Sequence, residues 1–361
     1  MRLYFKNYFG DKYILFSIFL LFIIGLTVIF SVTESINDYS PFFIKQCIGF
    51  IAGIILIFFL SITSYKDIVI WGTLIHILTI ILLILTLLIG HSVMGGQRWI
   101  NLGIFKLQPA ELSKITLPLF LVNYFYNNIL KSHTHLDWIK LLIFIALTSL
   151  LIIKQPDLGS GLIVGISSFL LLYISGLPRK IIIYLCLMFI FSTPILWFKL
   201  HDYQKKRILV FLGEGDRNKE RYQLEQSKIA IGSGGITGKG FLNGTQKNFK
   251  FLPENRTDFI FSILAEEFGF IGVFLTILIY LFIIIRYFIL FSFIDDEYAY
   301  MLCIGSLFPF IVSIIFNIGM IVGLFPVVGV PLPCISCGMA HIISTCISFG
   351  IINSVLSECD K

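Results

Sequence analysis

Residues 253–272 read PENRTDFIFSILAEEFGFIG, and within them the chain turns from polar to apolar. They close a basic segment, 199–257, which holds twelve Lys or Arg and six Asp or Glu; its net charge of +6 equals that of the whole chain. They open an apolar run, 258–291, that is longer than the roughly 20 helical residues needed to cross a bilayer. One carboxylate, Asp258, therefore stands where a basic loop meets a membrane helix, a position suited to an anionic substrate.

The composition indicates a membrane protein. Hydrophobic residues make up 57% of the 361 residues and charged residues 13%, about half the charged share of a soluble domain. We predict an all-α polytopic membrane protein, a single domain over 1–361, with one large extracytoplasmic loop (199–257) between the seventh and eighth of ten transmembrane helices. The ten apolar segments are 13–32, 43–63, 70–90, 107–125, 138–153, 157–176, 180–198, 258–291, 299–323 and 333–356.

The distribution of Lys and Arg predicts the orientation in the membrane. If the N-terminus is cytoplasmic, the inner segments carry ten Lys or Arg, and the short outer loops carry only Arg98, Lys106 and Lys154. The positive-inside rule then places both termini in the cytoplasm and 199–257 outside. Loops of that length cross largely regardless of charge, so the external bases need another reason. An anionic ligand is one reason, and a solvated loop without a partner is the alternative.

A glycine-dense run, GSGGITGKG at 232–240, lies inside the basic segment. It is not a P-loop, because Ser233 stands where the first glycine is required and Gly240 stands where a hydroxyl residue is required. Thr237 likewise breaks the G-x-G-x-x-G pattern. Glycines can still bring backbone N–H groups close to a phosphate, and Lys239 adds a positive charge. A tight turn without a ligand is the alternative.

Asp258 and two deeper carboxylates mark the start of the eighth apolar segment. Asp258 can serve as a helix cap, but Arg256 and the basic loop adjoin it, and its helical face is otherwise small. Glu266 and Glu267 lie two turns deeper. Carboxylates in a membrane helix are costly unless they are paired or hydrated, so they predict a polar cavity or a buried pair.

Polar residues also stand at two earlier membrane entrances. Glu111 and Lys114, at i and i+3 in the fourth segment, can form an internal salt bridge or present the lysine to a lipid phosphate. Arg98 and Trp99 precede that segment. Asp157 opens the sixth, where helix capping is again the alternative.

A metal centre held by the protein alone is not indicated. Cys334 and Cys337 form a C-x-x-C motif without a second Cys or His pair nearby, so buried thiols are the simpler interpretation. The histidines show no clustered zinc pattern. The identity of any metal ligands is left open.

Six stretches together resemble the SEDS family, the shape, elongation, division and sporulation proteins. They cover nearly the whole chain in the family's order, and that family also has ten spans. VVGVPLP (327–333) is closer to the elongation members than to the division members. The stretches are GGQRWINLG (95–103), QPAELSK (108–114), QPDLGSG (155–161), QSKIAIGSGGITGKGFLNGTQ (226–246), FLPENRTDFIFSILAEEFGFIG (251–272) and NIGMIVGLFPVVGVPLPCIS (317–336).

The resemblance implies a function and a set of roles. The family polymerises lipid II into peptidoglycan strands together with a class B penicillin-binding protein. Its catalytic aspartate corresponds to Asp258. Its other motif residues correspond to Arg98, Trp99, Glu111, Lys114 and Asp157. One departure stands out: where the family usually reads SYGGSS, this chain reads Ser336-Cys-Gly-Met-Ala-His341, which loses two hydroxyl residues and a glycine and puts their substrate contacts in doubt.

The residues and the resemblance agree on where the chemistry lies. The resemblance implies an inverting glycosyltransferase in a bacterial inner membrane, with Asp258 as general base. Polymerisation needs a base for the acceptor hydroxyl and positive charge for the pyrophosphate leaving group. Candidate substrate-binding residues are Arg98, Trp99, Glu111, Lys114, Asp157, Lys239, Arg256, Glu266 and Glu267. We expect lipid II, a class B penicillin-binding protein and membrane lipids as partners, no nucleic acid, no organic cofactor, and possible use of Mg²⁺ or Mn²⁺. The alternatives are a lipid II flippase and a non-catalytic scaffold for the penicillin-binding protein.

Overall fold

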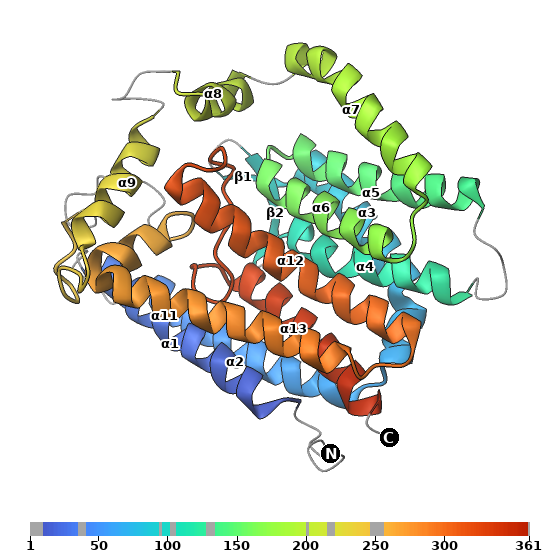
Figure 1. Ribbon diagram of the computed structural model, residues 1–361, viewed down its shortest axis with the longest axis horizontal. Helices are drawn as coiled ribbons and strands as arrows, with labels where there is room; N and C mark the ends of the chain where they lie inside the picture. The colour runs from blue at the N-terminus through green and yellow to red at the C-terminus, as the bar shows by residue number, and fades with distance from the viewer. Residues whose placement is uncertain are drawn as a thin grey trace.

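The computed structural model describes residues 10–34, 41–93, 96–101, 106–127, 134–199, 202–214, 221–245 and 256–359. Within these ranges the chain forms a bundle of helices with a small sheet beside it (Figure 1). Parts of the basic loop, 215–220 and 246–255, lie outside the described residues, and so do predictions that concern them.

Each of the ten predicted apolar segments falls on a helix. These helices are α1 (Lys12–Glu34), α2 (Pro41–Ile62), α3 (Tyr65–Ile89), α4 (Pro109–Asn127), α5 (His135–Lys154), α6 (Leu158–Ile174), α7 (Arg179–Lys199), α11 (Ile260–Phe291), α12 (Glu297–Val322) and α13 (Met339–Cys359). Among the described residues, seven of them, all but α4, α6 and α7, are long and apolar enough to cross a membrane. The chain is thus a multi-pass membrane protein; the count of ten crossings stays a prediction.

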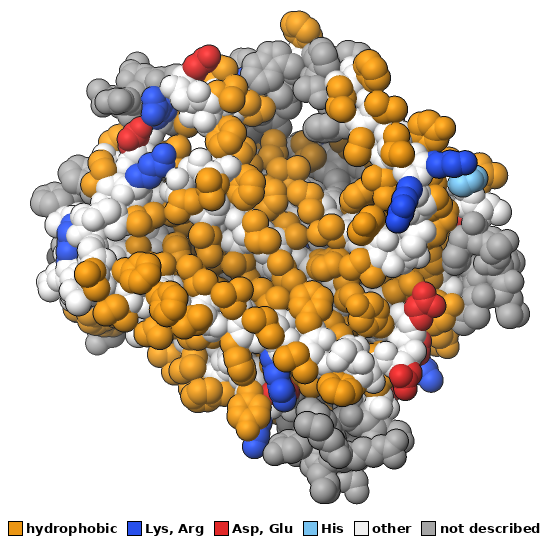
Figure 2. All heavy atoms as spheres, viewed as in Figure 1, with side chains coloured by type: hydrophobic (Ala, Val, Ile, Leu, Met, Phe, Trp, Pro, Cys, Tyr) orange, Lys and Arg blue, Asp and Glu red, His pale blue; other side chains and the backbone are white. Residues whose placement is uncertain are grey.

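The surface is that of a protein surrounded by lipid. Figure 2 shows apolar side chains over most of one face, with charged side chains at its margins. Many large apolar side chains on α2, α3 and α11 are exposed, among them Phe59, Ile70 and Phe282. An aqueous surface rarely carries so broad an apolar area, whereas the hydrocarbon core of a bilayer accommodates it.

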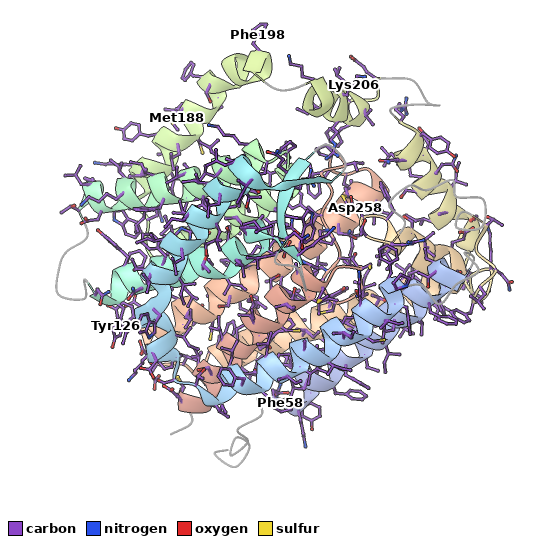
Figure 3. The ribbon with its side chains drawn as sticks, turned by 180° about the vertical axis from the view of Figure 1, so that it is seen from behind. Phe58, Tyr126, Met188, Phe198, Lys206 and Asp258 are labelled. Atoms are coloured by element: carbon purple, nitrogen blue, oxygen red, sulfur yellow. The ribbon has the colours of Figure 1, made fainter. Side chains whose placement is uncertain are left out.

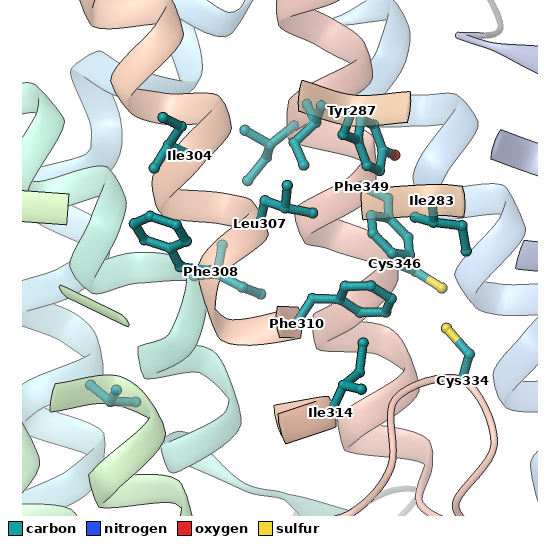
Figure 4. Close-up of a cluster of buried hydrophobic side chains, with 14 of the residues drawn as sticks. Ile283, Tyr287, Ile304, Leu307, Phe308, Phe310, Ile314, Cys334, Cys346 and Phe349 are labelled. Carbon is teal, nitrogen blue, oxygen red and sulfur yellow. The ribbon is translucent and has the colours of Figure 1, made fainter. Parts of the chain in front are cut away.

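Helix α12 lies at the centre of the bundle. It is buried along most of its length and packs against α4, α6 and α13. Its residues Phe310 and Ile314 meet Tyr287 of α11 and Phe349 of α13 in a continuous apolar core (Figure 4). Around this centre, α2 packs on α13, α3 on α4, and α5 on α6. The ends of α4, α6, α11 and α12 are thereby held close together.

The structure corrects the all-α prediction in one place. Between α3 and α4 the chain forms a three-stranded antiparallel sheet in the order β1 (His91–Val93), β2 (Gly96–Asn101) and β3 (Lys106–Leu107). No apolar alternation long enough to predict strands is present in these short segments. The sheet carries the Gln97-Arg98-Trp99 motif beside the bundle.

The last predicted segment, 333–356, is also corrected, because its helix begins at Met339. Residues 323–338 instead form an irregular segment between α12 and α13. Pro331 and Pro333 lack the backbone N–H that a helix requires, and the Ser336 hydroxyl accepts a hydrogen bond from the Leu332 N–H at 2.7 Å. We call residues 327–338 the signature segment, since it forms one wall of the candidate site.

The described part of the basic loop includes the helices α8 (Asp202–Phe211) and α9 (Tyr222–Gly234). The apolar residues of 222–231 recur at helical spacing, which predicts a helix, and α9 confirms that prediction. Helix α9 packs against α11 and α12, and buries Leu224, Ser227 and Ala230. The loop is therefore partly built onto the bundle.

Candidate active site

Asp258 lies in a turn just before α11, and the backbone around it is fixed by three hydrogen bonds. The carbonyl of Arg256 accepts from the Cys337 N–H at 2.9 Å. The carbonyl of Thr257 accepts from the Ser336 hydroxyl at 2.6 Å, and that of Asp258 from the Asn317 amide at 3.0 Å. Three consecutive carbonyls are thus held by α12 and the signature segment, so the position of Asp258 is set by its main chain.

The Asp258 carboxylate lies against the backbone of Gly329. A methyl group at Gly329 would come within 3.2 Å of Asp258 Oδ2, and Gly329 has a φ of +75°, which favours glycine. Asp258 itself is half-buried. Figure 3 shows it at the end of the bundle that faces Lys206 of the basic loop, far from Phe58 at the other end. A glycine at this point lets the carboxylate stay beside the signature segment and remain reachable.

The motif residues that precede α4 and α6 lie near the same wall of the site. Arg98 donates to the carbonyls of Gln155 (3.3 Å) and Pro156. Asp157 caps α6 by accepting from the Ser160 N–H at 3.1 Å, and its other oxygen accepts from Gln108 at 3.1 Å. The capping interpretation of Asp157 thus describes its geometry. The next turn of α6 packs against Val328–Val330 of the signature segment.

Glu111 and Lys114 form a buried ion pair next to this wall. Lys114 Nζ lies 2.6 Å from Glu111 Oε1, and both side chains are only 4% exposed. The other oxygen, Glu111 Oε2, accepts from the Ser344 hydroxyl at 2.8 Å and lies 3.3 Å from His341 Nδ1. A cavity about the size of one water molecule separates Lys114 and His341 from Ser313 and Pro333. The internal salt bridge predicted as one of two alternatives is present.

Glu266, Glu267 and Lys239 form a second centre, whose two carboxylates come eight and nine residues after Asp258 in the sequence. Glu266 Oε1 lies 2.7 Å from Lys239 Nζ and accepts from the N–H and hydroxyl of Thr245 at 2.8 and 2.7 Å. Glu267 accepts from Ser31 of α1 at 2.5 Å. Both carboxylates are buried, as the prediction of a buried pair requires.

The glycine run packs on a break in α11. At Gly269 the helix has φ +64°, and the freed carbonyls of Glu266 and Glu267 accept from the N–H groups of Lys239 and Gly240 at 3.0 Å each. A methyl group at Gly238 would lie 2.1 Å from the Glu267 carbonyl oxygen, so only glycine fits. The backbone N–H groups that we expected near a phosphate are therefore bound to the helix.

The remaining predicted residues lie at the edges of the site. The Arg256 guanidinium stacks 4.8 Å from the ring centre of Phe42 on α2, a cation–π contact beside Asp258. Trp99 is half-buried on β2. Burial raises the pKa of the Cys337 thiol, while Arg256 and Lys45 act in the opposite direction.

Four residues of the site were missed by the sequence prediction. Asn317, Ser336 and Gly329 hold Asp258, and His341 completes the ion pair. All lie in or beside the signature segment, which was quoted only for its resemblance. A polar Asn in an apolar helix was the available signal for Asn317, because membrane helices seldom carry an amide without a partner.

The geometry suits chemistry that uses one carboxylate on an anionic substrate. Among the described residues, no three Asp, Glu, His or Cys side chains gather as a metal-binding group. Asp258 is a half-buried acid on a fixed main chain, whereas Glu111, Glu266 and Asp157 are fully buried. A fixed and reachable carboxylate is what a general base requires.

The chain is similar to known proteins over most of its length. A family model for FtsW, RodA and SpoVE, described as cell cycle protein, matches residues 11–361. The peptidoglycan glycosyltransferase MrdB of Escherichia coli K12 is 38% identical over 287 residues, which cover 79% of this chain and 77% of MrdB. MrdB of Helicobacter pylori is 38% identical over 321 residues, which cover 87% of this chain and 83% of that protein.

Solved structures share the fold. The crystal structure of the Thermus thermophilus rod shape determining protein RodA matches with a TM-score of 0.72 at 24% identity, over 96% of both chains. A peptidoglycan synthase complex, described as coordinating polymerization and crosslinking, matches with a TM-score of 0.83 at 23% identity, over 97% of this chain and 98% of that one. Because the family model spans almost the whole sequence and relatives are 38% identical to it over 79% and 87% of this chain, the chain belongs to the FtsW/RodA/SpoVE family of cell cycle proteins, the SEDS family.

Proposed function

We propose that this chain is a peptidoglycan glycosyltransferase that polymerises lipid II into glycan strands for cell-wall elongation and cell shape. Its relatives named MrdB carry that enzyme name and are 38% identical to it. The observation that carries the proposal is the placement of Asp258: half-exposed, with its main chain fixed by three hydrogen bonds, at the end of the bundle that bears the basic loop.

Asp258 acts in this proposal as the general base. It takes the proton from the acceptor sugar hydroxyl while that oxygen attacks the anomeric carbon of the donor, and the bond from that carbon to the pyrophosphate breaks. The attack is direct, so the configuration inverts and no covalent enzyme intermediate forms. A general base typically contributes about 10²- to 10⁴-fold to the rate.

Fewer basic residues can supply positive charge to the departing pyrophosphate than the sequence suggested. Arg256 lies two residues from Asp258 in the sequence, and its guanidinium stacks on Phe42 of α2. Lys114 is next to the signature segment, although Glu111 holds it. Arg98 is bound to main-chain carbonyls and Lys239 is bound to Glu266. These contacts favour a structural role for both residues over phosphate binding. We assign the phosphates to Arg256 and Lys114.

A divalent cation fits the proposal only as a bridge between protein and substrate. Mg²⁺ is commonly held by one or two carboxylates together with phosphate oxygens and water, and Asp258 offers one carboxylate. Mn²⁺ would use the same oxygens. If this is right, removal of divalent cations by a chelator abolishes polymerisation and Mg²⁺ or Mn²⁺ restores it; unchanged activity in chelator rules the cation out.

The membrane placement belongs to the same proposal: a bacterial inner membrane, ten crossings in one domain, both termini cytoplasmic and 199–257 outside. Asn243 is exposed in the basic loop, and Cys359 is exposed near the C-terminus. With Cys186 replaced by Ser, a membrane-impermeant thiol reagent should label Asn243→Cys in intact cells and native Cys359 only after permeabilisation. The reverse pattern would contradict both the proposed orientation and the placement of the active site on the outer side of the membrane.

We further propose a class B penicillin-binding protein as partner, since the matching synthase complex joins polymerization with crosslinking. In the deciding experiment, the purified protein receives lipid II that it can reach without transport across a membrane. The reaction is run with and without that partner. Polymer formation supports the enzyme. Translocation without polymer supports a flippase, and activity that appears only from the partner supports a scaffold.

A further inference from the structure

His341 stands where the resembled family has serine, and it brings an imidazole ring into the Glu111–Lys114 ion pair. It lies in the first turn of α13 and is 6% exposed. Its Nδ1 is 3.3 Å from Glu111 Oε2. A carboxylate at this position accepts, so Nδ1 carries the hydrogen in this contact. Glu111 is therefore shared by two basic side chains, Lys114 on its own helix and His341 on α13.

The second ring nitrogen of His341 is free to take a proton. His341 Nε2 is buried and has no hydrogen-bond partner among the residues that the structure describes. His341 lines the small cavity that Lys114, Ser313 and Ser348 also line. With the hydrogen on Nδ1, the lone pair of the ring is on Nε2, which is the atom that takes up a proton.

Few charged groups face the ring. From α4 they are Glu111 and Lys114. Helix α12 and the signature segment present Phe310, Ser313 and Pro333 to the cavity, and α13 itself presents the hydroxyls of Ser344 and Thr345. Helix α2 meets this turn of α13 at Gly49, against Met339 and Ile342. The cluster of Glu111, Lys114 and neutral His341 has zero net charge, and a proton on His341 makes it +1.

We propose that His341 is a positioning residue whose protonation competes with Lys114 for Glu111, releasing the Lys114 ammonium toward a phosphate of the substrate. The inference rests on the proposed function and adds a control to the same site. Histidine changes charge between about pH 5 and about pH 8, and an added positive charge beside Lys114 attracts an anion. The pyrophosphate of lipid II is esterified at both ends and keeps its charge over that range, so a pH dependence of binding reports on the protein.

The test is equilibrium binding of lipid II to the full-length protein in lipid nanodiscs, from about pH 5.5 to about pH 8. The parent should bind about tenfold more tightly at the low end, the change that one pKa unit of coupling produces. His341→Asn keeps an amide donor near the position of Nδ1 but cannot take a proton, so its binding should lose this slope. The exposed His135 on α5 supplies the matched control: His135→Asn should keep the parental slope.

Two results would overturn the inference: a parent whose affinity varies less than about twofold over this range, or a His341→Asn variant that keeps the parental slope. The parent measurement decides even if the variant does not fold, and His341→Ser offers a second side chain that does not titrate. Lipid II binding with the predicted slope but without polymerisation would refute the proposed function alone. Polymerisation without the slope would refute the inference alone.

Discussion

Two acidic centres, Asp258 just before α11 and Glu266 within it, differ in what surrounds them. At Glu266 the carboxylate is fully buried and bound by Lys239 and Thr245, and the glycine run closes over the break in the helix. At Asp258 the protein binds the main chain and leaves the carboxylate half-exposed beside Gly329. A fully buried carboxylate with an ammonium and a hydroxyl as partners stabilises a fold, whereas a half-buried carboxylate can still be reached by a substrate. Glu111, bound by Lys114 and His341, belongs with Glu266 in this comparison.

The largest effect on stability should come from the buried pair on α4. Lys114→Met leaves Glu111 buried with only neutral partners, and loss of one member of a buried ion pair costs about 3–5 kcal/mol of unfolding free energy. Thermal unfolding measures the loss. The double variant Lys114→Met/Glu111→Gln should recover most of it. If Lys114 also binds phosphate, lipid II binding stays weak in the double variant; recovered binding would make the pair purely structural.

A smaller loss is expected at the helix break. Glu266→Gln removes the charge that Lys239 and Thr245 hold, and hydrogen bonds to a charged group contribute about 1.5–3 kcal/mol. The melting temperature should fall, while the polymerisation rate per folded molecule stays close to parental. Glu225→Gln is the control, because its pair with Arg221 is partly exposed and should contribute less than about 1 kcal/mol. A large rate loss in Glu266→Gln at unchanged stability would show that Glu266 takes part in the reaction as Asp258 does.

Gly329→Ala tests the contact with Asp258. A side chain at positive φ costs about 1–2 kcal/mol. Gly176 has φ +93° with open space around it, so Gly176→Ala should carry the same backbone cost without touching the site. Equal melting temperatures with a rate loss confined to Gly329→Ala would show that Gly329 places the carboxylate. Equal rates in both variants would contradict the geometry proposed here.

The smallest effect should appear at Asp157. As the cap of α6 it contributes about 1 kcal/mol, which Asp157→Ala would lose and Asp157→Asn would largely keep, since both Asp and Asn cap helices well. Unfolding curves of the two variants give the difference. An equal, strong loss of polymerisation in both at unchanged stability would instead assign Asp157 a chemical role.

The sequence was sufficient to locate the helices, because a lipid environment demands long apolar runs and leaves few alternatives. It predicted α9 from its periodicity, and the resemblance pointed to Asp258. It misjudged the start of α13, although Pro331 and Pro333 were visible, because an apolar segment in a membrane protein was assumed to be helical throughout.

Pairings between distant residues could not be predicted. Lys239 looked like a phosphate ligand because it lies among glycines, but its partner Glu266 is 27 residues away and is reached only through the break at Gly269. The hydrogen bonds from Asn317 and Ser336 to the backbone at 257–258 likewise join segments separated by 59 and 79 residues. Such contacts depend on how helices pack, which local spacing does not reveal.

The most direct test of the account is the initial rate of lipid II polymerisation by Asp258→Asn in the presence of the partner, normalised to folded protein and compared with Glu266→Gln. Asn preserves the shape of the side chain and the backbone bonds around it, so expression and melting temperature should match the parent. The rate should fall by about 10²- to 10⁴-fold in Asp258→Asn alone. A parental rate in Asp258→Asn would show that the carboxylate is not the base, and the catalytic assignment would have to move to another acid.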